Sequence, residues 1–231
     1  MRKREENPFE NETIANEWIK SIELEQQGFR DKDIYPRLIK WKMSVSGKTF
    51  LDIGSGQGLC SEKIDLKDHE QYIGVEPSKH LLQRAKQLYQ NKNRKFILGN
   101  AYNLPIESES IDGVFSVAVW FHLKDIKSAA KELSRTLKKN GKFLIVTADP
   151  EGYKAWEVLF SDYKKDDEKI VGKVHIPVNP LSKNVFYFHP WQSLKKSFDN
   201  AGLVITKTEA FGQDKDNTGL NYFMSVSGFK S

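Results

Sequence analysis

A glycine-rich turn is the stretch of this sequence best suited to binding a small molecule. Gly54, Gly56 and Gly58 occupy alternate positions directly after the apolar run 50–53, which we expect to form a buried strand. Residues 59–66 can begin a helix. A turn from strand into helix brings backbone N–H groups and small residues close to a ligand. The pattern therefore predicts a binding site at the end of a strand, although a glycine turn without a ligand has the same composition.

The spacing of the glycines narrows the choice of ligand. A nicotinamide dinucleotide site requires G-x-G-x-x-G, but the third position of that pattern is Leu59, because Gly58 comes one residue early. The observed pattern, D-x-G-x-G-x-G, begins at Asp52 and resembles the first motif of the class I S-adenosylmethionine-dependent methyltransferases. The resemblance implies S-adenosylmethionine as the cofactor. The motif residues that would bind it are Asp52, Gly54, Ser55, Gly56 and Gly58.

An acidic residue follows at the spacing that this family shows. Residues 72–75 read as a second strand, and Glu76 ends it. An acid at this position can accept hydrogen bonds from both ribose hydroxyls of a nucleoside. Pro77 comes next and could lie against the adenine face. A surface glutamate is the alternative reading, but the joint occurrence of turn, strand and acid favours a nucleoside site.

The segment 99–105 resembles the family's pattern G-D-A-x-x-L-P, which follows the third strand. In the family, the aspartate binds the adenine amino group, and the next backbone N–H meets a ring nitrogen. Asn100 stands in place of that aspartate, and its amide oxygen can still accept a hydrogen bond, without the charge. We therefore expect Asn100 to keep the role through a weaker or differently oriented contact, with Ala101 and Tyr102 beside it. A polar turn is the alternative.

The order of the expected elements predicts the fold. Residues 111–117, which resemble the family's S-F-D-x-V strand, and residues 142–147 add a fourth and a fifth strand. Strands that alternate with helices form a parallel sheet, and ligands bind outside the carboxyl ends of its strands, where Val117 would also lie. The resemblance implies a single-domain α/β, Rossmann-like class I methyltransferase fold. Its seven-stranded sheet would be mostly parallel, with one antiparallel strand from a C-terminal hairpin.

Two further segments are expected to cover the site. We predict an N-terminal helical cap over residues 1–45 and a methyltransferase domain over residues 46–231, with an insertion at about 164–190. In the family, helices ahead of the first strand often close over cofactor and acceptor. Aromatic residues of the cap, the insertion and the segment after the fourth strand would line the acceptor pocket. They are Trp18, Tyr35, Phe121, Tyr187 and Trp191.

Local patterns give four more expectations. Residues 1–12 look like a ragged polar start. The helix that begins near residue 126 should end at Asn140-Gly141. The spacing of apolar residues predicts a helix over 153–160, and the charged run 164–169 predicts a solvated loop.

Two histidines are candidates for a general base. His122 follows the fourth strand, at the edge where the transferred methyl group should point, and His189 belongs to the aromatic insertion. Either could take a proton near neutral pH, or could cap a helix or face solvent.

The five histidines show no metal-ligand spacing. Cys60 follows a leucine, so the Pro-Cys nucleophile of cytosine-C5 methyltransferases is absent, as is the N/D-P-P-Y/F/W segment of adenine-N6 and glutamine methyltransferases.

The composition fits one globular domain. The chain has 231 residues, of which 39% are hydrophobic. No apolar stretch approaches the about 20 residues that cross a membrane, and the charged N-terminus shows no secretory signal. Cys60 is the only cysteine, which excludes an internal disulfide and fits a cytoplasmic protein. The net charge of +5 is spread along the chain and favours a solvated surface over nucleic-acid binding.

From these features we expect methyl transfer from S-adenosylmethionine to a small-molecule acceptor by direct in-line displacement. The cofactor carries the difficult chemistry, and positioning by the protein can contribute roughly 7–11 kcal/mol. Two other classes stay open. An RNA or protein methyltransferase would show a basic groove beside the pocket. A non-catalytic nucleoside-binding protein on the same fold would bind the cofactor without turnover.

Overall fold

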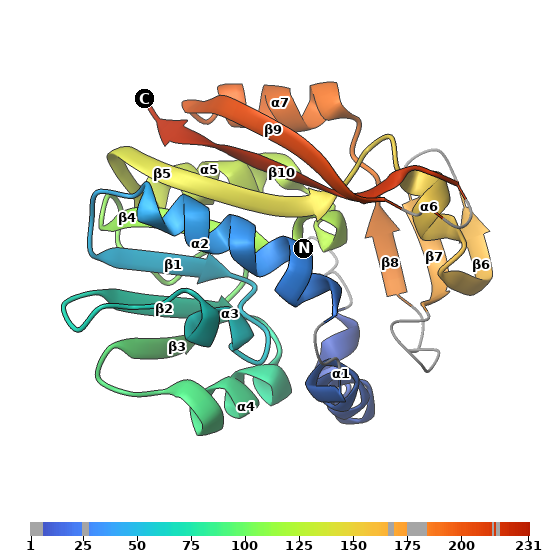
Figure 1. Ribbon diagram of the computed structural model, residues 1–231, viewed down its shortest axis with the longest axis horizontal. Coiled ribbons are helices and arrows are strands. Elements are labelled where there is room, and N and C mark those ends of the chain that lie inside the picture. The colour runs from blue at the N-terminus through green and yellow to red at the C-terminus, as the bar shows by residue number, and fades with distance from the viewer. Residues whose placement is uncertain (1–6, 25–27, 166–168, 175–183, 214, 216–217) are drawn as a thin grey trace.

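A seven-stranded sheet forms the centre of the molecule, in the order β3-β2-β1-β4-β5-β10-β9 (Figure 1). The computed structural model describes residues 7–24, 28–165, 169–174, 184–213, 215 and 218–231. β10 runs antiparallel to both of its neighbours, whereas β1 to β5 pair in parallel. This arrangement confirms the predicted Rossmann-like sheet with one antiparallel strand. The strands are β1 (Thr49–Ile53), β2 (Gln71–Glu76), β3 (Arg94–Leu98), β4 (Ile111–Val117), β5 (Leu137–Ala148), β9 (Leu203–Gln213) and β10 (Asn221–Lys230).

Helices cover both faces of the sheet. Side chains alternate along β1, so that Phe50 joins a hydrophobic cluster with Leu38 of α2, whereas Leu51 joins a second cluster with Leu133 of α5. The first cluster also includes residues of α4, and the second includes residues of α7. The three layers leave the carboxyl ends of the strands open for a ligand. The helices are α2 (Tyr35–Met43), α3 (Leu59–Lys63), α4 (Lys79–Tyr89), α5 (Ile126–Thr136) and α7 (Trp191–Asp199).

The described part of the chain ahead of β1 is largely helical, as the apolar spacing predicts. Helix α1 (Glu12–Leu24) is joined to α4 by an ion pair between Glu23 and Arg84, with 2.6 Å between Oε1 and Nη2. A π-helical turn (Arg30–Ile34) then leads into α2. A 3-10 turn (Pro8–Glu10) precedes α1. That turn corrects the expectation of a ragged start, because residues 7–10 have a defined structure.

The insertion forms a small antiparallel sheet in the order β6-β7-β8. It begins earlier than predicted, because Phe160 packs edge-on against Phe186 with ring centroids 5.0 Å apart. Phe160 therefore opens a strand instead of closing the predicted helix. Of the run predicted as a loop, Lys164 and Lys165 belong to β6 and Lys169 to β7, whereas residues 166–168 lie outside the described residues. Residues 175–183 lie outside the described residues. The elements are α6 (Tyr153–Glu157), β6 (Phe160–Lys165), β7 (Lys169–Val174) and β8 (Asn184–Tyr187).

The junction between α5 and β5 also differs from the prediction. α5 ends at Thr136, well before Asn140-Gly141, and Leu137 begins β5 by pairing with Ile111. Leu137 is fully buried, so its apolar side chain packs in the core as part of β5 and does not extend α5. Asn140 has a positive φ of 62°, which places an irregularity within the strand.

Candidate functional site

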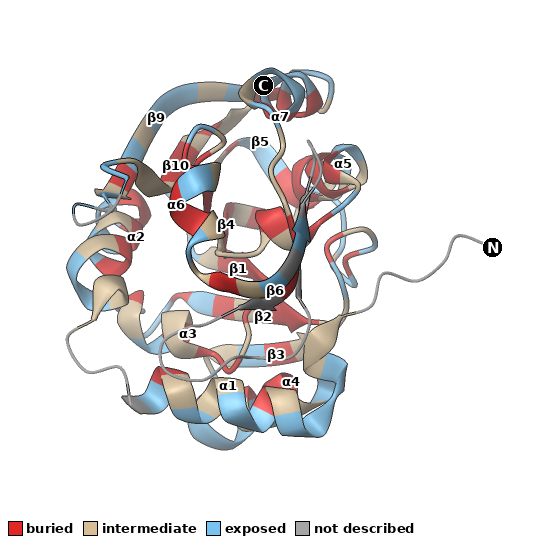
Figure 2. Cartoon of the chain, turned by 90° about the vertical axis from the view of Figure 1, so that its right-hand side faces the viewer, coloured by how far each residue is buried: buried red, intermediate tan, exposed pale blue. Residues whose placement is uncertain are grey.

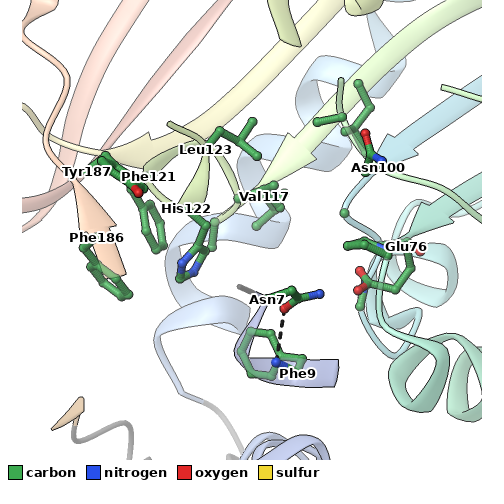
Figure 3. Close-up of a pocket in the computed structure, with 18 of the residues that line it drawn as sticks. Asn7, Phe9, Glu76, Asn100, Val117, Phe121, His122, Leu123, Phe186 and Tyr187 are labelled. Atoms are coloured by element: carbon green, nitrogen blue, oxygen red, sulfur yellow. Dashed lines mark hydrogen bonds between the residues drawn. The ribbon is translucent and has the colours of Figure 1, made fainter. Parts of the chain in front are cut away.

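A cavity of about 2060 Å³ lies at the carboxyl ends of β1, β2 and β4. Its one side is formed by the glycine turn, Glu76 and residues 100–102. Aromatic residues of η3 (Trp120–His122) and β8 lie on the other side, where Figure 3 shows Phe121, Phe186 and Tyr187. Aromatic residues of α1 and α6 also line the cavity. A pocket for one small ligand usually has about 300–1,000 Å³. The cavity therefore has room for two ligands side by side, which a group-transfer site needs.

Gly56 is the point where the glycine turn opens into the cavity. A Cβ built on Gly56 would meet nothing within 4 Å, and its φ is +55°. The backbone N–H of Gly56 donates to Oε2 of Glu76 at 2.9 Å. The turn and the acid of the neighbouring strand are therefore fixed to each other, and the free space above Gly56 belongs to the site.

Gly58 has a different function from the predicted one. It is not among the residues that line the cavity. Its φ is +87°, and a Cβ there would lie 3.0 Å from atoms of Ala85, Phe96 and Tyr89. Gly58 is thus required for turning the chain into α3 and for close packing against α4 and β3, because a larger residue would fill that contact.

Two buried carboxyl groups lie beneath the glycine turn. Asp52 is 1% exposed and accepts a hydrogen bond from the Tyr72 hydroxyl at 2.7 Å. Glu76 is 4% exposed and accepts from the backbone N–H groups of Gly56 and Ser78, each at 2.9 Å. Burial raises the pKa of both carboxyl groups to about 7. A ligand that brings positive charge or hydroxyl donors would stabilise their ionised forms.

Buried polar atoms of the turn provide a test of whether the predicted cofactor fits. Ser55 Oγ and both amide atoms of Gln57 are buried and have no hydrogen-bond partner among the described residues. Both residues line the cavity. Buried polar groups are normally hydrogen-bonded, so these atoms indicate a polar ligand with donors and acceptors. The amino-acid end of S-adenosylmethionine has both, and the residues present fit it.

Asn100 lines the cavity, but its side chain is engaged in its own turn. Oδ1 accepts from the backbone N–H of Tyr102 at 2.9 Å and of Asn103 at 3.1 Å. An amide oxygen has two lone pairs, so this oxygen has little capacity left for an adenine amino group. Asn100 therefore shapes the loop that carries Ala101 and Tyr102, which also line the cavity, as do Pro77 and Val117.

The loop-shaping function of Asn100 can be separated from base recognition. Asn100→Asp keeps the oxygen that holds the turn, so we expect affinity for S-adenosylhomocysteine within about threefold of wild type, whereas Asn100→Leu should lose about tenfold. Calorimetry would compare this ligand with its inosine analogue, in which a carbonyl replaces the adenine amino group. A loop-shaping residue leaves the ratio of the two affinities equal in the wild type and in Asn100→Asp. A changed ratio would show that this side chain reads the base.

Four of the five residues predicted for the acceptor pocket line the cavity. Trp18, Tyr35, Phe121 and Tyr187 line the cavity. Trp191 does not, because it packs against the hydrophobic cluster between the sheet and α5. Seen from the side, the insertion lies over the strand ends of the main sheet (Figure 2). Aromatic residues that the sequence pattern did not single out also line the cavity: Phe9, Phe29, Trp156, Phe186, Tyr222 and Phe223.

The two candidate histidines join the insertion to the segment after β4. His122 Nδ1 lies 3.4 Å from the carbonyl oxygen of Val185, and His189 Nε2 lies 2.7 Å from that of Leu123. Both histidines line the cavity. The Nε2 of His189 donates to a backbone carbonyl, so this nitrogen has no lone pair available for a proton. If Nδ1 of His122 carries the proton toward Val185, its Nε2 has a lone pair, and Figure 3 shows the ring in the cavity.

The surroundings of His122 keep its imidazole neutral. Its ring lies 4.5 Å from that of Phe121 and 4.9 Å from that of Phe186, centroid to centroid. This enclosure lowers the pKa of His122 to about 4, because burial disfavours the charged form. At neutral pH the ring can accept a proton or a hydrogen bond from a ligand.

The chain is similar in sequence to known methyltransferases. Residues 51–145 match the family described as Methyltransferase domain. The uncharacterized methyltransferase YcgJ of Bacillus subtilis (strain 168) is 33% identical over 175 residues, which cover 72% of this chain and 64% of YcgJ. The demethylmenaquinone methyltransferase of Staphylococcus aureus (strain JH9) is 25% identical over 211 residues, covering 82% of this chain and 86% of that protein. Alignments with other curated relatives span about half of their length, 46% and 47% in two cases.

A solved structure extends the likeness to the fold as a whole. A protein from Pyrococcus horikoshii OT3 superposes with a TM-score of 0.71 at 19% identity, covering 89% of this chain and 92% of that one.

Within the described part of the chain, no helix is long and apolar enough to cross a membrane. The same residues contain no group of three or more His, Cys, Asp or Glu side chains that could hold a metal ion.

Proposed function

Because the chain belongs to the class I S-adenosylmethionine-dependent methyltransferase family, we propose that it transfers a methyl group to a small-molecule acceptor. The observation that carries this proposal is one continuous cavity. It runs from the open face of Gly56 and the carboxyl group of Glu76 to the aromatic residues Phe121 and Phe186. A donor site and an acceptor site are thus adjacent at the carboxyl ends of the strands.

The cofactor half of the cavity follows from the glycine turn and the two acids. When bound, S-adenosylmethionine would supply a methyl group on a sulfonium: a bond would form between the acceptor and the methyl carbon as the carbon–sulfur bond breaks, and S-adenosylhomocysteine would leave. Glu76 accepts hydrogen bonds from hydroxyl groups, and Asp52 provides buried negative charge toward a cationic ligand. Ser55 and Gln57 offer hydrogen bonds that no described residue takes up. These side chains bind and orient, and the aromatic walls exclude water from the point of transfer.

The acceptor half supports a small and largely apolar acceptor. Its walls include the rings of Trp18, Phe121, Trp156 and Phe186 and the side chain of Leu159. His122 is one polar group beside these walls, and its low pKa keeps it neutral. A demethylmenaquinone methyltransferase among the relatives is consistent with a small-molecule acceptor. Lysines at the cavity mouth, such as Lys124 and Lys127, are exposed and interspersed with Asp125, which does not favour a nucleic-acid groove.

A labelled methyl donor tests the proposal. The wild-type protein is incubated with methyl-labelled S-adenosylmethionine and a metabolite extract of low molecular mass, and products are separated by mass. We expect label in one or a few small molecules and none in the Gly56→Val control, which should not bind the cofactor. Label in added RNA or protein instead would overturn the acceptor class. Cofactor binding without turnover over a broad acceptor panel would overturn catalysis and favour a nucleoside-binding protein.

A further inference from the structure

The N-terminal turn is part of the binding site, although the sequence pattern left it as a polar start. Residues 7–10 line the cavity together with Glu76 and His122. The Ser78 hydroxyl donates to the carbonyl oxygen of Phe9 at 2.5 Å, and the Phe9 ring lies 5.4 Å from that of Trp18. Ser78 also donates its backbone N–H to Glu76. The turn is therefore held on the same loop that fixes the predicted ribose acceptor.

Asn7 presents an amide group to the cavity from this turn. Its Oδ1 accepts from the backbone N–H of Phe9 at 3.1 Å and so caps the 3-10 turn. Its NH₂ group has no hydrogen-bond partner among the described residues. Figure 3 shows the Asn7 side chain between His122 and Glu76, with its nitrogen on the side facing Glu76. Capping thus fixes the oxygen and leaves two N–H donors for a ligand.

We propose that the Asn7 side-chain NH₂ group donates a hydrogen bond to a ribose oxygen of the bound cofactor, opposite Glu76. This inference rests on the proposed function. A ribose hydroxyl has one proton to donate and two lone pairs to be satisfied. In its ionised form Glu76 can accept the proton but has none to donate. Each of its oxygens also accepts one backbone N–H, from Gly56 and from Ser78. Asn7 supplies the complementary donor, so the ribose is held from two sides.

The arrangement makes the cofactor contact depend on a correctly seated turn. The capping bond to Phe9 fixes the Asn7 amide plane, and Ser78 fixes the turn over the site. Because Asn7 touches the cofactor and not the reacting atoms, we expect it to act on affinity. A residue that served only as a cap would act on the turn alone and would be replaceable by any good capping residue.

Asn7→Ser separates the two functions, because serine is a good cap but lacks the amide donors. We expect S-adenosylhomocysteine to bind Asn7→Ser about 3–10-fold more weakly by calorimetry, the range of one neutral hydrogen bond. The melting temperature without ligand should be unchanged. Asn11→Ser is the matched control, since Asn11 Oδ1 caps α1 through the N–H of Ile14 and does not line the cavity. It should bind as the wild type does.

Ribose-modified ligands complete the test. If Asn7 donates to a ribose oxygen, the penalty of Asn7→Ser should vanish with either the 2′-deoxy or the 3′-deoxy form of S-adenosylhomocysteine. Wild-type affinity for Asn7→Ser, or an equal penalty with all three ligands, would overturn the assignment of Asn7. Failure of the wild type itself to bind S-adenosylhomocysteine would instead overturn the proposed function, so the two failures are distinguishable.

Discussion

Gly56→Val is expected to weaken the binding of S-adenosylhomocysteine by at least about 100-fold, a loss of about 2.7 kcal/mol. The reason is the direction in which this glycine faces. A Cβ on Gly56 meets no protein atom within 4 Å, so the valine side chain would occupy the cavity itself. The fold should tolerate the substitution, apart from the cost of a positive φ in a β-branched residue. Calorimetry on the purified variant measures the loss.

Gly219→Val is the matched control for backbone strain. Gly219 also has a positive φ, +70°, and an open surrounding within 4 Å, but it lies in the turn between β9 and β10 and does not line the cavity. We expect the two variants to lose similar stability and only Gly56→Val to lose the ligand. Gly54 is unsuitable as a control, because its Cβ would lie 2.4 Å from Val119. Affinity within twofold of the wild type for a folded Gly56→Val would place the cofactor elsewhere.

The cofactor half of the site was predictable because its signals are local. Three glycines follow one strand, Glu76 follows the next, and parallel strands bring their carboxyl ends to one edge. The sequence pattern did not distinguish residues that face the cavity from residues that only pack within the fold. Gly58 and Gly56 look equivalent in the sequence, yet only Gly56 faces the cavity. Asn100 resembles a base-reading residue, yet its oxygen holds a turn.

The positions of the insertion and of the N-terminal turn over the cavity were not predictable, because they depend on contacts between residues far apart in the sequence. The insertion strands have poor periodicity, and they are held by the packing of Phe186 on Phe121, with ring centroids 4.6 Å apart, and on Phe160. The pair Asn7-Pro8 is a recognisable start of a helical turn, so the turn itself could have been found. Its place over the cavity depends on Ser78, 69 residues further along the chain.

His122→Ala is expected to lower the turnover number about 10²-fold or more, if the acceptor arrives protonated. The Nδ1 contact with Val185 orients the ring, and the neighbouring phenylalanine rings keep it neutral. Its Nε2 therefore keeps its lone pair at neutral pH and can take the proton that the acceptor loses in the transition state, as a weak base with a lowered pKa. Affinity for S-adenosylhomocysteine should be nearly unchanged, because His122 lies on the acceptor side of the cavity. The rate is measured at saturating cofactor and acceptor, once the acceptor is known.

The pH profile distinguishes His122 from the two buried acids. The pKa of His122 is lowered to about 4, so its neutral form persists above that pH, and turnover at saturation should fall only as the pH drops toward 4. Asp52 and Glu76 have pKa values raised to about 7, and protonation removes the charge that a cationic ligand favours. The Michaelis constant for the cofactor should therefore rise as the pH falls below about 7, while saturated turnover stays constant until the pH approaches 4.

His122→Asn decides whether the histidine acts as a base or only as a contact between the two segments. An asparagine amide nitrogen can occupy the place of Nδ1 and donate to Val185, but it leaves no proton acceptor at the position of Nε2. If His122 acts as the base, His122→Asn and His122→Ala should have equally low turnover numbers. His189→Ala, which loses the contact with Leu123, should raise the Michaelis constant for the acceptor and leave the pH dependence of saturated turnover intact. Wild-type turnover in His122→Asn would mean that the ring only positions the insertion, and that the acceptor reacts without a base from this chain.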